Sequence, residues 1–342
     1  MSSGWGCRSR HAPIAETCHN FPERLPSKSN EMPRARSLRV APIAVFLTVA
    51  VVALAANANG APRPQALVAQ DLHTGYGLLR PGAGSLVPFV EPFRSAAEVA
   101  WSPEGSAVAF TRPDRGGERL FVQHGAGVPQ RVLDAPASPL LQPVWAPQGE
   151  LLAIVRLVRA KGNGATRVFV IDGAGRNRQI TASVNDGVSD VSPSWSRDGR
   201  RILFVRRSPG ASALVVAPVT ASASHVLIRE RVTGQGRGRG ITSAAWSPSG
   251  TMVAFIDGDG VKLLRVRDLR VTLVAAATSA FNPVWSPDSR RLAWGERSSP
   301  SGADGLTTFV ASLATGVKTK LGDGLVPFQW PAKCLCDRFV SG

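Results

Sequence analysis

Side chains that commonly carry out catalysis are sparse in this sequence of 342 residues. After residue 62 the histidines are His73, His124 and His225, which fall in separate predicted turns or strand ends and are not expected to converge. The sequence has no G-x-S-x-G nucleophile elbow, no H-E-x-x-H zinc motif and no phosphate-binding glycine loop after a strand. We therefore expect no catalytic residues and no cofactor.

The segment Asp257-Gly-Asp-Gly260 has the composition of a calcium-binding loop. It lacks the further spaced carboxylates and the closing glutamate that an EF-hand loop needs. Asp-Gly is also the usual composition of a tight hairpin turn. We predict a turn at this position and no metal site.

Charged side chains in two predicted loops are the best candidates for ligand binding. The glycine-rich segment 234–240 contains two arginines, whose guanidinium groups suit bidentate contacts with phosphate or carboxylate. The alternative for this segment is a flexible surface linker. The candidate binding residues are Asp186, Asp190, Arg229, Arg237 and Arg239. Whether they lie together depends on the elements that hold them.

A repeat sets those elements. Five segments have a Trp-Ser-Pro-x-Gly type of turn followed by a short apolar strand, and a sixth, degenerate copy follows near residue 330. The tryptophans are Trp101, Trp145, Trp195, Trp246, Trp285 and Trp330. Each is a large apolar residue that can fill the space between adjacent sheets. Four short strands in roughly 45 residues make one propeller blade.

We therefore predict an all-β protein, a six-bladed β-propeller with four antiparallel strands in each blade. In such a fold the loops between blades lie on the same face as the turns between second and third strands. This register would place the five candidate binding residues around the mouth of a central channel.

These turns and apolar strands resemble the repeats of TolB-like propellers, also described as WD40-like or PD40 repeats, over roughly residues 66–340. The resemblance implies binding of a partner protein in the cell envelope. TolB itself has an α/β domain before its propeller, and this sequence has no room for one after the predicted cleavage site. The resemblance is therefore to the propeller family and not to TolB itself. Propellers of prolyl-oligopeptidase-like enzymes share the repeat, but no hydrolase domain follows it here.

The two ends of the repeat region predict how the ring closes. Val326–Trp330 and Cys334–Val340 are expected to be the first two strands of the last blade. Ala66–Leu72 and Tyr76–Leu79 are expected to supply its other two strands. N-terminal strands would then complete the C-terminal blade, two strands plus two, and leave no open blade face.

The N-terminal region predicts export. Basic residues precede an apolar run and a small-x-small cleavage motif at 56–58, which is typical of a signal peptide at 32–58. The alternative is a retained membrane anchor, since 40–62 is uncharged and long enough to span a bilayer. Residues 1–31 are expected to be disordered or to lie upstream of the true start, and 62–342 to form the propeller. The protein would be periplasmic, extracellular or anchored facing outside.

The formal net charge of +16 raises the question of an anionic partner. The basic residues are scattered, which favours a solvated arginine-rich surface, with an anionic polymer as an alternative ligand. Nucleic acid is not expected, because aromatic residues for base stacking are not interleaved with the arginines. We predict a monomeric, non-enzymatic scaffold that binds an envelope protein or another ligand over its channel face. The alternative is an envelope polysaccharide lyase or hydrolase acting at the channel mouth.

Overall fold

The computed structural model of this chain describes residues 67–71, 75–79, 86–89, 96–114, 117–125, 127–136, 140–160, 163–181, 187–220, 223–232, 240–297 and 305–330. They all belong to one compact unit that spans residues 43–342. Their regular elements are β-strands. Across these ranges we find no helix with the length and hydropathy needed to span a membrane.

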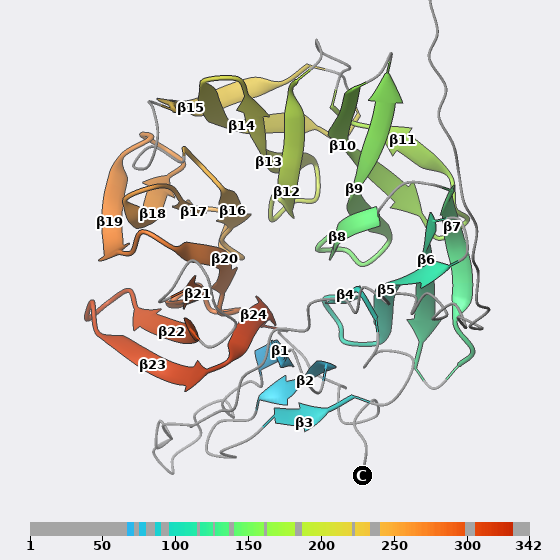
Figure 1. Cartoon of the computed structure of the whole chain (residues 1–342), viewed down its shortest axis with the longest axis horizontal. Coiled ribbons are helices and arrows are strands. Elements are labelled where there is room, and N and C mark those ends of the chain that lie inside the picture. Colours follow the sequence, from blue (N-terminus) through green and yellow to red (C-terminus); the bar gives the residue numbers. More distant parts are fainter. Residues whose placement is uncertain are drawn as a thin grey trace, which may run out of the picture. The chain divides into compact units, whose positions relative to one another are not determined.

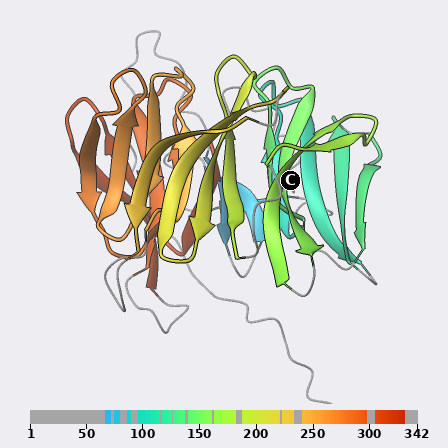
Figure 2. The same ribbon diagram turned by 90° about the horizontal axis from the view of Figure 1, so that it is seen from above.

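The described strands form six four-stranded antiparallel sheets arranged as the blades of a propeller (Figure 1). Figure 2 shows the sheets from the side, with strands running between the two faces of the ring. This confirms the predicted six-bladed propeller. In each blade the first strand is innermost, next to the channel, and the fourth is outermost.

The blades are numbered along the chain, and blade 6 joins its two ends. Blade 1 contains β4 (Glu98–Trp101), β5 (Ala107–Asp114), β6 (Gly117–His124) and β7 (Gln130–Pro136); blade 2 contains β8 (Leu140–Trp145), β9 (Leu151–Ala160), β10 (Asn163–Asp172) and β11 (Asn177–Gln179). Blade 3 contains β12 (Ser189–Trp195), β13 (Arg201–Ser208), β14 (Ala211–Pro218) and β15 (His225–Arg231); blade 4 contains β16 (Ser243–Trp246), β17 (Met252–Ile256), β18 (Gly260–Arg265) and β19 (Val271–Ala276). Blade 5 contains β20 (Ala280–Trp285), β21 (Arg291–Arg297), β22 (Leu306–Ser312) and β23 (Lys318–Asp323), and blade 6 contains β24 (Leu325–Gln329), β1 (Leu67–Asp71), β2 (Gly75–Leu79) and β3 (Leu86–Pro88).

In blades 1, 3, 4 and 5 the turn after the innermost strand is held by a serine side chain. In blade 3 the Ser196 hydroxyl donates to Asp198 Oδ1 at 2.5 Å and accepts the Arg201 N–H at 3.0 Å. The Ser196 hydroxyl and the Arg200 N–H lower the pKa of Asp198, because both hydrogen bonds favour the ionised carboxylate. Gly199 has a φ of 65°, a conformation that glycine adopts without a steric penalty. The repeat motif is therefore a turn-forming unit.

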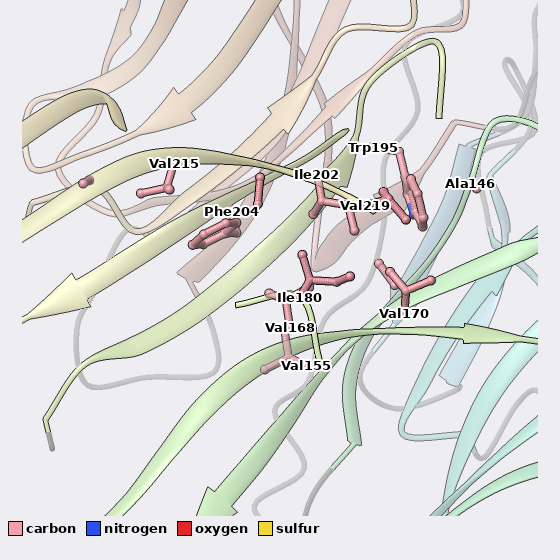
Figure 3. Close-up of a cluster of buried hydrophobic side chains, with 13 residues drawn as sticks. Ala146, Val155, Val168, Val170, Ile180, Trp195, Ile202, Phe204, Val215 and Val219 are labelled. Carbon is pink, nitrogen blue, oxygen red and sulfur yellow. The ribbon is translucent and has the colours of Figure 1, made fainter. Parts of the chain in front are cut away.

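Three of the tryptophans link their blade to the one before it by a hydrogen bond as well as by packing. Figure 3 shows Trp195 with apolar side chains of blades 2 and 3, including Val170, Ile180 and Ile202. The Trp195 indole N–H donates to the Val144 carbonyl of blade 2 at 3.0 Å. Trp145 and Trp285 make the same contact with the blade before them, at 2.9 and 3.0 Å. Each such indole therefore contributes both apolar area and a directed bond.

N-terminal strands complete the last blade, as predicted, but they supply three strands and not two. The strand order in blade 6 is β24-β1-β2-β3. The prediction of two plus two was wrong, because β1 occupies the second position, next to β24, that we had assigned to 334–340. Val68 and Ala69 of β1 are fully buried, as a strand between two others requires. Residues 334–340 lie outside the described residues.

Gln329 connects blade 6 to blade 1 at this seam. Its carboxamide Oε1 accepts the Trp101 N–H at 2.8 Å, and its Nε2 donates to the Trp101 carbonyl at 2.9 Å. One side chain thus satisfies both backbone groups of a residue that lies 228 positions away in the sequence. The ring is closed by this pair of bonds together with the strands of blade 6.

Candidate binding site in the central channel

The six innermost strands surround a cavity of about 550 Å³ along the axis of the propeller. Its wall contains residues of the innermost strands of every blade. In blades 1 to 4 it also contains residues of the turn that follows the strand. We call the end at which the innermost strands begin the entry end. The loops between blades reach the channel at this end.

A set of polar residues lines the entry end, each three positions before the tryptophan of its blade. We call this set the entry ring: Glu98, Gln142, Ser192, Ser243 and Asn282. Gln142, Ser192 and Asn282 have φ values of 55°, 55° and 50°, and each is followed by proline. Left-handed backbone is unusual for such residues and often marks a ligand site. The strand register shifts at all three positions.

Hydrogen bonds run around the ring from one blade to the next. The Gln142 N–H donates to the Glu98 carboxylate, and the Gln142 Oε1 accepts the Ser192 N–H at 2.7 Å. The Ser192 hydroxyl in turn donates to the Ala244 carbonyl at 3.1 Å and accepts its N–H at 3.0 Å. The entry ring is therefore a preorganised polar surface across blades 1 to 4.

Glu98 is the acidic residue of the described cavity wall. Burial raises its pKa to about 7, because the charged form is disfavoured away from water. The Gln142 N–H opposes this rise, and the Glu118 carboxylate adds to it. A carboxyl with this pKa exists in both protonation states near neutral pH, so it can donate or accept a hydrogen bond or bind a cation.

The candidate binding residues taken from the sequence occupy different places in the blades. Asp190 is fully buried and its carboxylate pairs with the Arg206 guanidinium, at 2.8 Å from Nε and 3.1 Å from Nη2. Arg229 is exposed on β15, the outermost strand of the same blade, so β13 and β14 separate it from the strand of Asp190. Asp186, Arg237 and Arg239 lie outside the described residues. Their role in binding remains a prediction.

The segment 257–260 forms the expected turn. Asp257 Oδ1 accepts the N–H groups of Asp259 and Gly260 at 2.9 and 3.1 Å. The Lys262 ammonium lies 2.5 Å from Asp257 and 2.9 Å from Asp259, in the position that a bound cation would need. Among the described residues, no group of three or more His, Cys, Asp or Glu could hold a metal ion.

Histidines do not add chemistry to the channel in the described part of the chain. His124 and His225 are exposed at the end of β6 and the start of β15, in different blades, and neither lines the cavity. His73 lies outside the described residues.

Sequence reasoning missed the entry ring, although the sequence contains a pattern that could have revealed it. When the repeats are aligned on tryptophan, the third residue before it is polar in five of the six copies. These positions are not among the predicted binding residues, and only the fold shows that they meet at one end of a channel.

Comparisons with known proteins agree with this architecture. The model of the PD40 family, the TolB beta propeller domain, matches residues 94–294, which is more than half of the chain. The chain belongs to this family. No curated protein matches the sequence.

Solved structures similar to this TolB-like propeller share its fold at low sequence identity. TolB from Acinetobacter baumannii has 14% identity and a TM-score of 0.55, over 78% of this chain and 65% of TolB. The chain therefore spans less than two thirds of that protein. A putative TolB from Agrobacterium tumefaciens has 17% identity and a TM-score of 0.52, over 80% and 95% of the two chains. A chain of a nidogen/laminin complex has 10% identity and a TM-score of 0.55, over 79% and 99%. Identities this low show the fold alone.

Proposed function

We propose that this TolB-like propeller is an exported scaffold that binds an extended segment of a partner protein at the entry end of its channel, without catalysis. The observation that carries the proposal is the cavity of about 550 Å³ with a polar ring at one end. A concave site with a few fixed polar groups is the usual form of a ligand site. Pro143, Pro193 and Pro283 also line that wall, and proline has no backbone N–H.

Two further points support a protein ligand. Hydrogen bonds between blades already hold the backbone of the entry ring, so an incoming segment would meet a surface that loses little entropy on binding. A chain with the same fold forms part of a nidogen/laminin complex, which shows that such a propeller can belong to a protein assembly.

A photocrosslinking experiment tests this function. p-Benzoylphenylalanine would replace Asn282 in the entry ring, and a control protein would carry it at Leu273, which is 58% exposed on the outermost strand β19. After irradiation in cells, we expect one dominant protein adduct at position 282 and none of the same mass at 273. Equal adducts at both positions, or none at 282, would contradict the proposal.

Export is the second part of the proposal and rests on the signal-peptide pattern at 32–58. Mass analysis of the purified protein should give a mature N-terminus near Asn59. A peptide that joins residues on both sides of Ala58 in the exported protein would contradict cleavage and favour a membrane anchor.

One observation favours a second candidate function, an envelope enzyme that degrades a polysaccharide at the channel mouth. The pKa of about 7 suits Glu98 to general acid–base catalysis. An oligogalacturonate lyase from Vibrio parahaemolyticus has the same fold, with 9% identity and a TM-score of 0.50 over 76% of this chain and 74% of the lyase. Release of unsaturated products from polygalacturonate that depends on Glu98 would favour this function, and no product would remove it.

A further inference from the structure

We propose that Glu98 binds a positively charged side chain, lysine or arginine, of the partner segment that enters the channel. This inference rests on the proposed function and specifies the chemistry of its ligand. It follows from the position of one carboxylate within the cavity wall.

The charges of the described wall are separated along the channel. Glu98 begins β4, and its neighbours in the entry ring are neutral amides and hydroxyls. Arg197 also lines the cavity, but it follows the end of β12 and belongs to the opposite end of the channel. Within the described wall, the entry end therefore carries a carboxylate and the opposite end carries a guanidinium.

Glu98 also has unused capacity to accept hydrogen bonds. An ionised carboxylate accepts up to about four hydrogen bonds. The donor that the described residues provide is the Gln142 N–H, and none of their basic side chains forms an ion pair with Glu98. A half-buried carboxylate without a basic partner is destabilising, and a ligand ammonium or guanidinium would supply that partner.

The surroundings of Glu98 favour exchange of its proton for a cation. The titratable groups near it are Glu118 of β6 and Tyr76 of β2, and neither carries a positive charge. With a pKa of about 7, the carboxyl keeps its proton in part when the channel is empty. Because a cation binds the ionised form, raising the pH from 6 to 8 should increase affinity roughly tenfold as the ionised fraction rises.

Blocked pentapeptides provide a direct test by isothermal titration calorimetry. The probe is acetyl-Gly-Ser-Lys-Ser-Gly-amide, and its neutral match carries norleucine in place of lysine. We expect the wild-type protein to bind the lysine peptide at least tenfold more tightly than the norleucine peptide at pH 8, and to lose most of this preference at pH 6. Glu98→Gln should abolish the preference, and Glu98→Asp, which retains the charge, should keep part of it.

Glu104→Gln serves as the matched control, because Glu104 is an exposed carboxylate in the turn at the other end of β4. It should retain the full preference for lysine. Equal affinities of the two peptides for the wild-type protein, or an unchanged preference in Glu98→Gln, would overturn the inference. Spermidine that binds at Glu98 more tightly than the lysine peptide would also overturn it, because the site would then belong to a free polyamine.

The outcomes separate this inference from the proposed function. A partner adduct at Asn282 without any lysine preference would refute the role of Glu98 and leave the scaffold function intact. A lysine preference without a partner adduct would support the role of Glu98 and contradict the scaffold function.

Discussion

Replacing Gln329 with alanine should destabilise the propeller more than removing an ordinary bond between blades. The Gln329 carboxamide makes two hydrogen bonds, at 2.8 and 2.9 Å, with the backbone of Trp101, a residue that is fully buried. Each bond contributes about 1.5 kcal/mol at this buried position. We expect a total loss of about 3 kcal/mol.

Ser194→Ala is the comparison, because the Ser194 hydroxyl accepts a single N–H from Trp246 of the next blade at 2.9 Å. Its loss should cost about 1 kcal/mol. At about 2–4 °C per kcal/mol for a domain of this size, Gln329→Ala should lower Tm by roughly 6–12 °C and Ser194→Ala by a few degrees.

Differential scanning calorimetry of the two variants measures these differences. Gln329→Met keeps the side-chain volume without the hydrogen bonds, and it should be destabilised almost as much as Gln329→Ala. Equal Tm values for Gln329→Ala and Ser194→Ala would refute the conclusion that the carboxamide is the main bond across the seam. A near-normal Tm for Gln329→Met would assign the loss to packing.

Three other changes test particular parts of the structure. Ala146→Ser should stabilise the protein by ~0.5–1 kcal/mol in urea denaturation. The new hydroxyl would take in blade 2 the place that the Ser196 hydroxyl has in the turn of blade 3. A loss of stability would contradict this reasoning. Asp190→Asn should lower the free energy of unfolding by about 2–3 kcal/mol, because the Arg206 guanidinium loses the buried carboxylate with which it pairs. Normal stability together with loss of partner-protein binding would instead identify Asp190 as a binding residue. Burial and Asp257 raise the pKa of Glu230 to about 7, above its ordinary value of 4.5. The folded state therefore holds the Glu230 proton more tightly than the unfolded state does. The stability that this proton provides is present below pH 4.5 and is lost as the pH rises to 7. Glu230→Gln should therefore raise Tm at pH 8 and leave it unchanged at pH 4, and an equal effect at both would exclude titration as the cause.

The fold could be predicted because its repeat residues build local structure in each blade. Ser196 and Gly199 form a turn, and Trp195 packs between blades and donates to the blade before it. Such local requirements leave a regular pattern in the sequence. The strand count at the seam could not be predicted, because 67–71 and 334–340 are both apolar enough to pair with β24. Only the three-dimensional pairing decides between them.

The candidate site was harder to predict for a related reason. Glu98 and Gln142 are far apart in the sequence and become neighbours only through the ring. Asp190 appeared to be a loop carboxylate available to a ligand, but the strand β12 begins before it and turns its side chain towards Arg206. Hydrophobic periodicity gives no information on which polar strand residues face a channel and which form buried ion pairs.

The three-plus-one closure of blade 6 also determines the order in which the protein can be completed. During synthesis β1, β2 and β3 emerge before every other described strand, yet the strand that must pair with β1 emerges after all of them. Until then, blade 6 has a bare inner edge and the Trp101 backbone has no carboxamide to bind. The ring therefore cannot close before β24 has been synthesised and is free to pair with β1.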